Sequence, residues 1–495
     1  MSVDTVNETR ARPARRARAK DPQGATRAIA ETAAALRFRA LPRHVAERAK
    51  DLVLDHLGVT LYGACLPWSC KVREIVLADG GKAASTIYGS RRVPARAAAL
   101  ANGTAAHAIE FDDTHDESLS HPACAILPAA FAIAEETGAS GRDFLAAMVA
   151  GYEAQCRFGA PLGNAIIRRG FHPTATLGVF GATAAVANLL RLDAGRIVSA
   201  FGSGASMSSG VMQFTEDAEG TMIKRLHAGL PAERGILAAR LAAIDFTGPR
   251  GAIEGTWGIG RVFAGVTDLG RVTEGLGERF EIERITVKLY PCCKLFHSLL
   301  EAIANCRAEH PFAAADVVAI EPFGPSNMID THMEFRPRST MAAQYSLPYA
   351  CAAGIVFDPT DPDSYGEARL EDKAALRIAD LVAPVVDDEL EAMFPRRFAG
   401  GVRIRLRNGR TLTSTVIDSK SSPDRPIGRD EMQAKFRTLV AGILAPARRD
   451  RIIDTVAQLD RLESVAELTK LLRGIALPVE PAPGKARRPT RGTGA

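Results

Sequence analysis

The period of the hydrophobic pattern changes near residue 280, and this change limits the folds open to the chain more than any other feature. Between residues 25 and 260, apolar residues recur at helical spacing, as in Val45, Ala49 and Leu52. From Ile282 to Tyr290 the pattern alternates instead, which is typical of a half-buried strand. Helical spacing returns after residue 428. We therefore predict a mostly α fold, in which a large all-helical domain is interrupted by a smaller α+β lid domain.

The same pattern divides the chain into segments. The predicted segments are a disordered basic tail at 1–24, a helical domain at 25–269, an α+β lid domain at 270–425, a C-terminal part of the helical domain at 426–475, and a second disordered basic tail at 476–495. The stretch 173–192, with Gly178 and Gly181, indicates a buried helix that packs closely against its neighbours. Asn408-Gly409 between two alternating runs predicts a hairpin with a type I′ turn.

Charge is concentrated at the two ends of the chain, whose net charge is +5 over 495 residues. The first twenty residues carry six basic and two acidic side chains, and Lys485, Arg487, Arg488 and Arg491 add four positive charges near the C-terminus. The body between these ends is therefore slightly acidic. A nucleic-acid-binding protein needs a basic folded face with aromatic residues, so basic tails alone do not predict that function.

The sequence contains no apolar run long enough to cross a bilayer, and its N-terminus lacks the apolar core of a secretion signal. Early acidic residues and few serines also argue against a mitochondrial transit peptide. Most of the eight cysteines lie among apolar helical residues, as expected of small buried side chains in a reducing compartment. We therefore predict a cytoplasmic protein.

A run of histidines and acidic residues from Ala101 to Pro122 is the strongest candidate for a functional site. It reads ANGTAAHAIEFDDTHDESLSHP and contains three histidines and five acidic residues. Such groups are costly to bury and contribute little to packing, so their crowding favours a site. The groups with metal-binding chemistry are Asp112, Asp113, His115, Asp116, Glu117 and His121. Their spacing matches no recognised metal motif, so we predict no metal and favour a set that binds an organic acid.

Three further segments supply cationic and titratable partners from distant parts of the sequence. They are Phe171-His172-Pro173-Thr174, Lys224-Arg225-Leu226-His227, and Lys288-Leu289-Tyr290-Pro291-Cys292-Cys293 with His297. Lys224 and His227 are three residues apart and share one helix face, where both suit a carboxylate. His172 stands at a helix start, where backbone N–H groups attract anions. Taken singly, Lys224 and His227 fit a solvated helix end as well as a site. A capping or packing residue is the better single interpretation of His172, and a surface lysine is that of Lys288.

Five blocks of sequence, in this order, resemble the MmgE/PrpD family, which includes 2-methylcitrate dehydratase and cis-aconitate decarboxylase. The blocks are NGTAAHAIEFDDTHDESLSHP, GFHPTATLGVFGATAAVANLL, GTMIKRLHAGLPAERGILAARLA with FTGPRGAIEG, KLYPCCKLFHSLLEAI, and AQYSLPYACAAGIV. The resemblance covers residues 25–470. It implies a helical large domain, a smaller α+β lid, a homodimer, no metal or organic cofactor, and an active site in the cleft between the domains.

The resemblance also implies site residues, position by position. It places Glu110, Thr114 and His121 from the first block, His172 from the second, Lys224 from the third, Lys288 and Cys293 from the fourth, and Tyr349 from the fifth. We expect His121, His172, Lys224, Lys288, Cys293 and Tyr349 to be catalytic, and Glu110, Thr114, His227 and His297 to bind substrate. The decarboxylase branch has an aspartate at the position of Glu110 and a histidine at that of Cys293.

The chemistry of these residue types supports a cofactor-independent lyase that acts on a citrate-like or aconitate-like polycarboxylate. An α-carbanion or enediolate adds negative charge, which Lys224 and Lys288 would stabilise. His121 or His172 has the intrinsic pKa of a base near neutral pH. Cys293 either takes part in acid–base chemistry or lies in an inert buried turn with Cys292. Three alternatives remain: an epimerase of an imino- or substituted succinate, a non-catalytic carboxylate-binding protein, and nucleic-acid binding through the tails.

Overall fold

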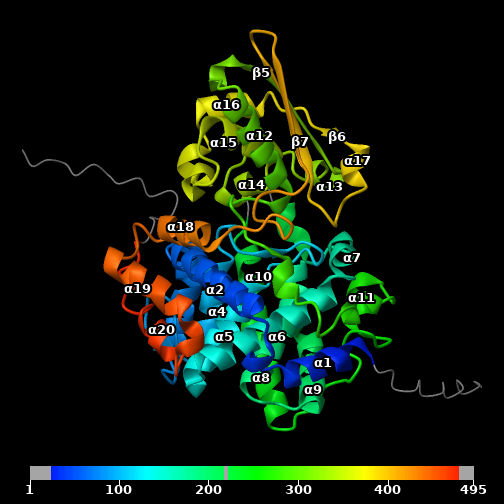
Figure 1. The fold of residues 1–495 in the computed structure, drawn as a ribbon, viewed down its shortest axis with the longest axis vertical. Coiled ribbons are helices and arrows are strands. Elements are labelled where there is room, and N and C mark those ends of the chain that lie inside the picture. The colour runs from blue at the N-terminus through cyan, green and yellow to red at the C-terminus, as the bar shows by residue number, and fades with distance from the viewer. Residues whose placement is uncertain (1–23, 217–220, 479–495) are drawn as a thin grey trace, which may run out of the picture.

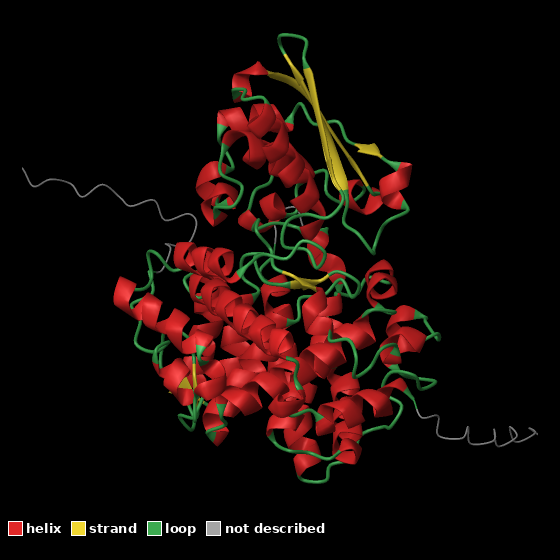
Figure 2. Cartoon of the chain, in the orientation of Figure 1, coloured by secondary structure: helices red, strands yellow, loops and turns green. Residues whose placement is uncertain are grey.

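The computed structural model describes residues 24–216 and 221–478, so almost all of both predicted tails lies outside the described residues. Helices dominate the chain, which confirms the predicted mostly α fold (Figure 2). Figure 1 shows a larger lobe of packed helices and a smaller lobe in which helices lie beside a sheet. No helix within the described residues has both the length and the apolar character needed to span a membrane. The cytoplasmic location stays a prediction.

The larger lobe is built from helices at both ends of the described chain. They are α1 (Ala25–Ala35), α2 (Arg43–Gly63), α3 (Pro67–Asp79), α4 (Ala95–Ala106), α5 (Ala123–Thr137), α6 (Gly141–Gly159), α7 (Gly163–Arg168), α8 (Pro173–Leu189), α9 (Ala194–Met207), α10 (Ile223–Ala243), α11 (Gly270–Thr273), α18 (Arg429–Leu439), α19 (Pro446–Ala457) and α20 (Ala466–Lys470). Two short antiparallel pairs join them: β1 (Ser85–Thr86) with β2 (Arg92–Val93), and β3 (Thr114–His115) with β4 (Ile285–Thr286).

Helix α8 lies at the centre of this lobe and packs against α5, α6, α9 and α10. Residues 173–188 of this helix are all buried. A Cβ atom at Gly181 would lie 2.7 Å from Oε1 of Gln155 on α6 and 2.8 Å from Cγ1 of Ile126 on α5. Only glycine lets these helices approach so closely. The predicted close packing of this helix is therefore confirmed.

The smaller lobe combines short helices with one sheet. Its elements are α12 (His297–Glu309), β5 (Val317–Gly324), α13 (Ser326–Ile329), α14 (Thr340–Gln344), α15 (Leu347–Val356), α16 (Lys373–Ala379), β6 (Val385–Val386), α17 (Asp388–Glu391), β7 (Gly400–Leu406) and β8 (Thr411–Val416). The strand order is β6-β5-β7-β8, with β5–β7 and β7–β8 antiparallel and β5–β6 parallel. Helix α12 packs on β7 and β8, and the apolar side chains between them form the core of this lobe.

The hairpin between β7 and β8 has the predicted position but a different turn. Gly409 has φ +84°, whereas Asn408 is not among the residues with positive φ. A type I′ turn needs positive φ at both central residues, so the prediction of that turn is wrong. Gly409 N–H donates to the carbonyl of Leu406 (3.0 Å), and the N–H of Leu406 donates to that of Arg410 (2.8 Å). This is a three-residue loop in which glycine takes the left-handed position.

Two predicted elements are shorter than their patterns suggest. The strand expected over 282–290 is limited to β4, because its partner β3 is only two residues long. The helical pattern that returns after residue 428 is likewise broken between α19 and α20. There, Leu462 accepts from the N–H of Gly141, and the N–H of Val465 donates to Ala139. The backbone of this break therefore bonds to the α5–α6 turn instead of continuing a helix.

Each lobe has its own main hydrophobic cluster, and the chain passes between the two clusters twice. The cluster of the larger lobe includes residues up to Val287 and resumes at Ile427, whereas that of the smaller lobe runs from Cys292 to Val416. At the first of these passages, Lys288 directly follows Val287. The first segment that connects the lobes therefore carries one of the predicted site residues.

Candidate active site

Five segments meet where the two lobes face each other. They are the loop 107–122 after α4, the start of α8 at His172, the start of α10 at Lys224, the segment 287–293, and Tyr345 at the end of α14. The β3–β4 pair, with Thr114 opposite Thr286, ties the first loop to the fourth segment. Residues far apart in sequence thereby reach one site.

Glu110 is the centre of the site. Its Oε1 accepts hydrogen bonds from Lys224 and, at 2.9 Å, from Arg225. Its Oε2 accepts from Lys288 Nζ and from the hydroxyl of Tyr345, both at 3.1 Å. Glu110, Lys224, Arg225 and Lys288 are all buried. We call Glu110 and its four partners the Glu110 cluster.

The backbone at Glu110 is strained. Its φ of +55° lies in the left-handed region, which a residue with a long side chain seldom adopts. Such strain costs about 1–3 kcal/mol and is found mainly where function requires a defined geometry. Here it accompanies a carboxylate that is bound by three cations, which supports a functional role for Glu110.

Positive charge exceeds negative charge in the cluster. Burial alone would raise the pKa of Glu110, but Lys224, Lys288 and Arg225 hold it well below its usual range. Burial lowers the pKa of Lys224, whereas Glu110 and Asp112 outweigh burial at Lys288 and raise its pKa. Three buried cations thus face two buried carboxylates, those of Glu110 and Asp112. Buried charge favours a partner of opposite sign, so the site suits an additional anion.

Asp112 and His107 extend the cluster on one side. Oδ2 of Asp112 lies 2.7 Å from Nδ1 of His107, and Nε2 of His107 lies 3.1 Å from Nζ of Lys224. Burial lowers the pKa of His107, so its imidazole is neutral at pH 7. His121, His107 and Lys288 together outweigh burial and hold the pKa of Asp112 below its usual range.

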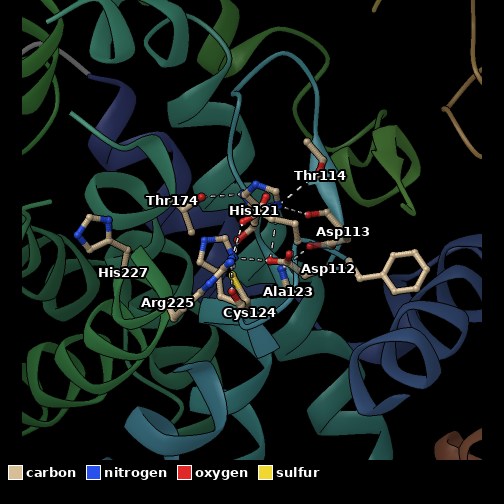
Figure 3. A network of polar contacts seen from close by, with 12 residues as sticks. Asp112, Asp113, Thr114, His121, Ala123, Cys124, Thr174, Arg225 and His227 are labelled. Carbon is tan, nitrogen blue, oxygen red and sulfur yellow. Dashed lines mark hydrogen bonds and ion pairs between the residues drawn. The ribbon is translucent and has the colours of Figure 1, made fainter. Parts of the chain in front are cut away.

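His121 is fixed by two hydrogen bonds. Its Nδ1 lies 2.8 Å from the backbone carbonyl of Asp113, and its backbone N–H donates to Oγ1 of Thr174 at 3.1 Å (Figure 3). A carbonyl only accepts, so the proton is on Nδ1 and the lone pair is on Nε2. Burial lowers the pKa of His121 to about 3, which keeps the imidazole neutral. Oγ1 of Thr114, another predicted site residue, lies 3.5 Å from Nδ1 of His121.

Asp113 supports this loop from behind. Its Oδ1 accepts from the N–H of Ala123 at the start of α5 (2.9 Å), and its Oδ2 accepts from the hydroxyl of Tyr152 on α6 (2.7 Å). Burial raises the pKa of Asp113 to about 7. Its carboxyl group therefore holds the loop that carries His121 in place and is not one of the charged groups around Glu110.

His172 and His227 form a pair. Their Nδ1 atoms are 3.1 Å apart, and the ring of Phe214 packs edge-on against both. Burial lowers the pKa of His172 well below its ordinary value and that of His227 to about 4. His172 stacks beside His107, with ring centroids 5.8 Å apart, whereas Figure 3 shows His227 apart from the loop around His121. His227 thus contacts His172 and Phe214.

Cys293 lies at the other side of the cluster. Its Sγ is 3.9 Å from Nε2 of His332, and its backbone N–H donates to the carbonyl of Gln344 at 2.8 Å. Burial raises the pKa of the Cys293 thiol to about 11, so the group keeps its proton at neutral pH. Cys292 is fully buried. The pair therefore offers a half-buried thiol and no thiolate nucleophile.

Two predicted site residues lie away from these contacts. The hydroxyl of Tyr349 donates to the carbonyl of Ser364 at 3.0 Å, and its ring packs against Tyr365 in the smaller lobe. Tyr345, one helical turn earlier, is the tyrosine that contacts Glu110. His297 is buried with its ring against Tyr290, and neither ring nitrogen has a hydrogen-bond partner.

Four residues of the site were absent from the predicted set: His107, Asp112, Arg225 and Tyr345. All four stand within sequence segments that were already marked as motifs, so membership of a motif was the available signal. Arg225 was hard to foresee because neighbours on a helix point about 100° apart. Tyr345 and Tyr349 are four residues apart, and spacing alone does not distinguish them.

His107, Asp112 and Cys124 offer three potential metal ligands within 4.8 Å of one another. Their hydrogen bonds favour a different interpretation. The thiol of Cys124 donates to the carbonyl of His121 at 3.1 Å, and burial raises its pKa well above the ordinary value. The Lys224 ammonium occupies the Nε2 side of His107. The neighbouring Lys224 cation disfavours a divalent metal between these three groups.

We therefore expect activity to survive removal of metals. The purified protein would be treated with EDTA and then dialysed against metal-free buffer, and kcat/KM would be compared with that of an untreated sample. An unchanged value is expected. Loss of activity on chelation, with recovery on adding a divalent cation, would instead assign a metal to His107, Asp112 and Cys124.

A large cavity lies beside the site and not within it. It has a volume of about 610 Å³, and Phe111 and Leu289 form part of its wall. These residues are the chain neighbours of Glu110, Asp112 and Lys288. The segments that carry the cluster thus present their charged side chains to the site and their apolar side chains to the cavity.

Comparison with known proteins gives an independent view of this site. Residues 27–271 match the MmgE/PrpD N-terminal domain, and residues 290–461 match the MmgE/PrpD C-terminal domain. A cis-aconitate decarboxylase of Aspergillus terreus (strain NIH 2624 / FGSC A1156) is 30% identical over 91% of this chain and 96% of that protein. The human cis-aconitate decarboxylase is 25% identical over 92% of this chain and 95% of that protein.

A cis-aconitate decarboxylase-like protein, oryM, of Aspergillus oryzae is 29% identical over 88% of this chain and 94% of that protein. The two domain matches together span most of the chain and include Glu110, His121, His172, Lys224 and Cys293. On this evidence the chain belongs to the MmgE/PrpD family.

Proposed function

We propose that the protein is a cofactor-independent lyase that acts on an aconitate-like or citrate-like polycarboxylate through α-proton chemistry. The observation that carries the proposal is the excess of buried positive charge around Glu110, beside histidines that are neutral at pH 7. Cations bind and stabilise the carboxylates of such a substrate, and a neutral imidazole can accept a proton. Relatives named cis-aconitate decarboxylase support the same substrate class.

The residues divide the work by their chemistry. Lys224, Arg225 and Lys288 hold substrate carboxylates and stabilise the negative charge that develops on the carbon chain. Nε2 of His121 removes or returns the α-proton. In a dehydration, the hydroxyl group leaves with its electron pair and a proton from a donor. In a decarboxylation, the C–C electron pair stays on the carbon as CO₂ leaves, and a donor then protonates that carbon. The hydroxyl of Tyr345 and the thiol of Cys293 are the candidate donors.

An epimerase of an imino- or substituted succinate is the second candidate. It is favoured by the two acid–base groups of unlike chemistry, the imidazole of His121 and the protonated thiol of Cys293. Epimerisation requires one group to remove the α-proton and another to return it on the opposite face. A non-catalytic carboxylate-binding protein would need only the cations.

One experiment separates these functions. The protein would be incubated with 2-methylcitrate, citrate, cis-aconitate and iminodisuccinate, followed by mass and chiral analysis of the products. Loss of 18 or 44 mass units identifies dehydration or decarboxylation (about the mass of water or CO₂), and inversion without a mass change identifies epimerisation. A His121→Ala sample, prepared identically, controls for contaminating enzymes. Binding without conversion of any substrate would leave the carboxylate-binding function.

Tyrosine variants test the site that the geometry defines. Tyr345→Phe removes the hydroxyl that contacts Glu110 and is expected to lower kcat/KM by about tenfold, the usual effect of losing one hydrogen bond to a charged group. Tyr349→Phe is the matched control, because that hydroxyl binds only a backbone carbonyl in the smaller lobe. Equal losses in both variants would contradict the choice of Tyr345.

We also propose a homodimer, as the family resemblance implies. Four large apolar side chains within residues 244–262 are exposed, namely Ile244, Phe246, Trp257 and Val262. Exposed apolar surface of this kind often covers an interface between subunits. Light scattering at micromolar concentration should give about twice the chain mass of 52.8 kDa. A particle of the monomer mass would contradict the proposal.

A further inference from the structure

A chain of three buried side chains reaches from Asp112 to Lys224 through His107. Asp112 and His107 join at 2.7 Å, and His107 and Lys224 join at 3.1 Å. The exposed fractions of Asp112, His107 and Lys224 are 3%, 0% and 0%. Water therefore does not compete for these contacts. The arrangement of the three side chains determines which of their atoms carry protons.

The order of donors and acceptors follows from Asp112. An ionised carboxylate only accepts, so the proton of the His107 ring stands on Nδ1 and points to Oδ2. The lone pair on Nε2 then faces Lys224, whose ammonium group only donates. The opposite tautomer would place two donors against each other. Asp112 thus selects the form of His107 that can accept a hydrogen bond from Lys224.

We propose that Asp112 and His107 are positioning residues that aim the ammonium group of Lys224 at the substrate; this inference rests on the proposed function. Lys224 has three N–H donors. One binds Glu110, one binds Nε2 of His107, and the third is directed to a substrate carboxylate. A lysine side chain has four rotatable bonds, so a second fixed partner reduces its freedom before the substrate arrives.

Two variants of His107 separate positioning from simple packing. The amide oxygen of glutamine can take the place of Nε2, so His107→Gln keeps an acceptor for Lys224 but loses the contact with Asp112. The amide nitrogen of asparagine can take the place of Nδ1, so His107→Asn keeps the contact with Asp112 but loses the acceptor. We expect His107→Asn to lower kcat/KM about ten- to a hundredfold, mainly by raising KM, and His107→Gln to cost less than about tenfold.

The reverse order, with His107→Asn the more active variant, would overturn the proposal. Lys224→Ala provides the reference for complete loss of the aimed ammonium, and it should resemble His107→Asn in its KM. If all variants fall equally in kcat with unchanged KM, His107 does not act through substrate binding by Lys224, and the proposal fails.

The tautomer is measured separately from activity. Nitrogen-15 NMR of histidine-labelled wild-type protein reports which ring nitrogen carries the proton, and His107→Gln identifies the His107 signal by its loss. We expect a neutral ring with the proton on Nδ1. A proton on Nε2, or on both nitrogens, overturns the proposal whatever the kinetic constants of the variants. If the wild-type protein converts no polycarboxylate while the Nδ1 form is observed, the proposed function fails and the role of Asp112 in selecting the tautomer stands.

Discussion

Replacement of His121 by alanine is expected to lower kcat by about 10²–10⁴, the usual contribution of a positioned proton-transfer group. The variant removes the Nε2 lone pair, whereas the cations that hold the substrate remain, so KM should change little. Exchange of the substrate's α-proton with deuterium from solvent should fall in parallel. Steady-state kinetics and NMR detection of the exchange measure the two effects independently.

His44→Ala is the matched control, because His44 is exposed and pairs with Glu283 at the surface. It should leave kcat and exchange unchanged. Burial lowers the pKa of His121 to about 3, so the imidazole becomes charged only as the pH falls toward that value. His121 should therefore produce no acid limb in kcat/KM between pH 5 and 8. Wild-type kcat and exchange in His121→Ala would reject His121 as the base and favour His172.

Glu110→Gln is expected to destabilise the substrate-free protein by about 3–5 kcal/mol. The change leaves Lys224, Arg225 and Lys288 buried without the carboxylate that they share, and removal of one partner from a buried ionic group has a cost of this size. The free energy of unfolding would be measured by urea denaturation. An added tricarboxylate such as tricarballylate should restore part of the loss, because it brings negative charge back to the three cations.

Glu321→Gln provides the control, because Glu321 pairs with Arg403 and both side chains are more than two-fifths exposed. Loss of a surface pair of this kind costs about 0–1 kcal/mol. If Glu110→Gln were no less stable than Glu321→Gln, the three cations would not depend on Glu110 for compensation. The site would then have no need of an additional anion.

The fold was largely predictable because hydrophobic period reports local structure directly. The helical spacing predicted from residue 25 to residue 260, the glycines of α8 and the position of the β7–β8 hairpin all confirm this within the described residues. The type of hairpin turn, the length of β4 and the break between α19 and α20 were not predictable. The break, for example, depends on its backbone partners Ala139 and Gly141, which lie more than 300 residues away in the sequence. The predicted domain boundaries at 269 and 425 stay predictions.

Several of the predicted site residues lie together in the structure. Glu110, Lys224 and Lys288 meet, and Thr114 lies beside His121. His227, Tyr349 and His297 do not contact Glu110 in this way, although each stands within or close to a correct motif. The roles of these residues in catalysis remain proposals, and the variants described above test them.

The sequence by itself determined which residue types are present, the helical and strand periods, and the crowding of histidines, acids and lysines in four segments. Those properties are local, because they follow from side-chain chemistry and from spacing along one element. Only the tertiary structure decided which of these groups contact one another. Whether Tyr345 or Tyr349 reaches Glu110, and whether His107 faces Asp112 or solvent, depends on how separate elements pack. Burial then sets the strength of those contacts and the pKa values that follow from them.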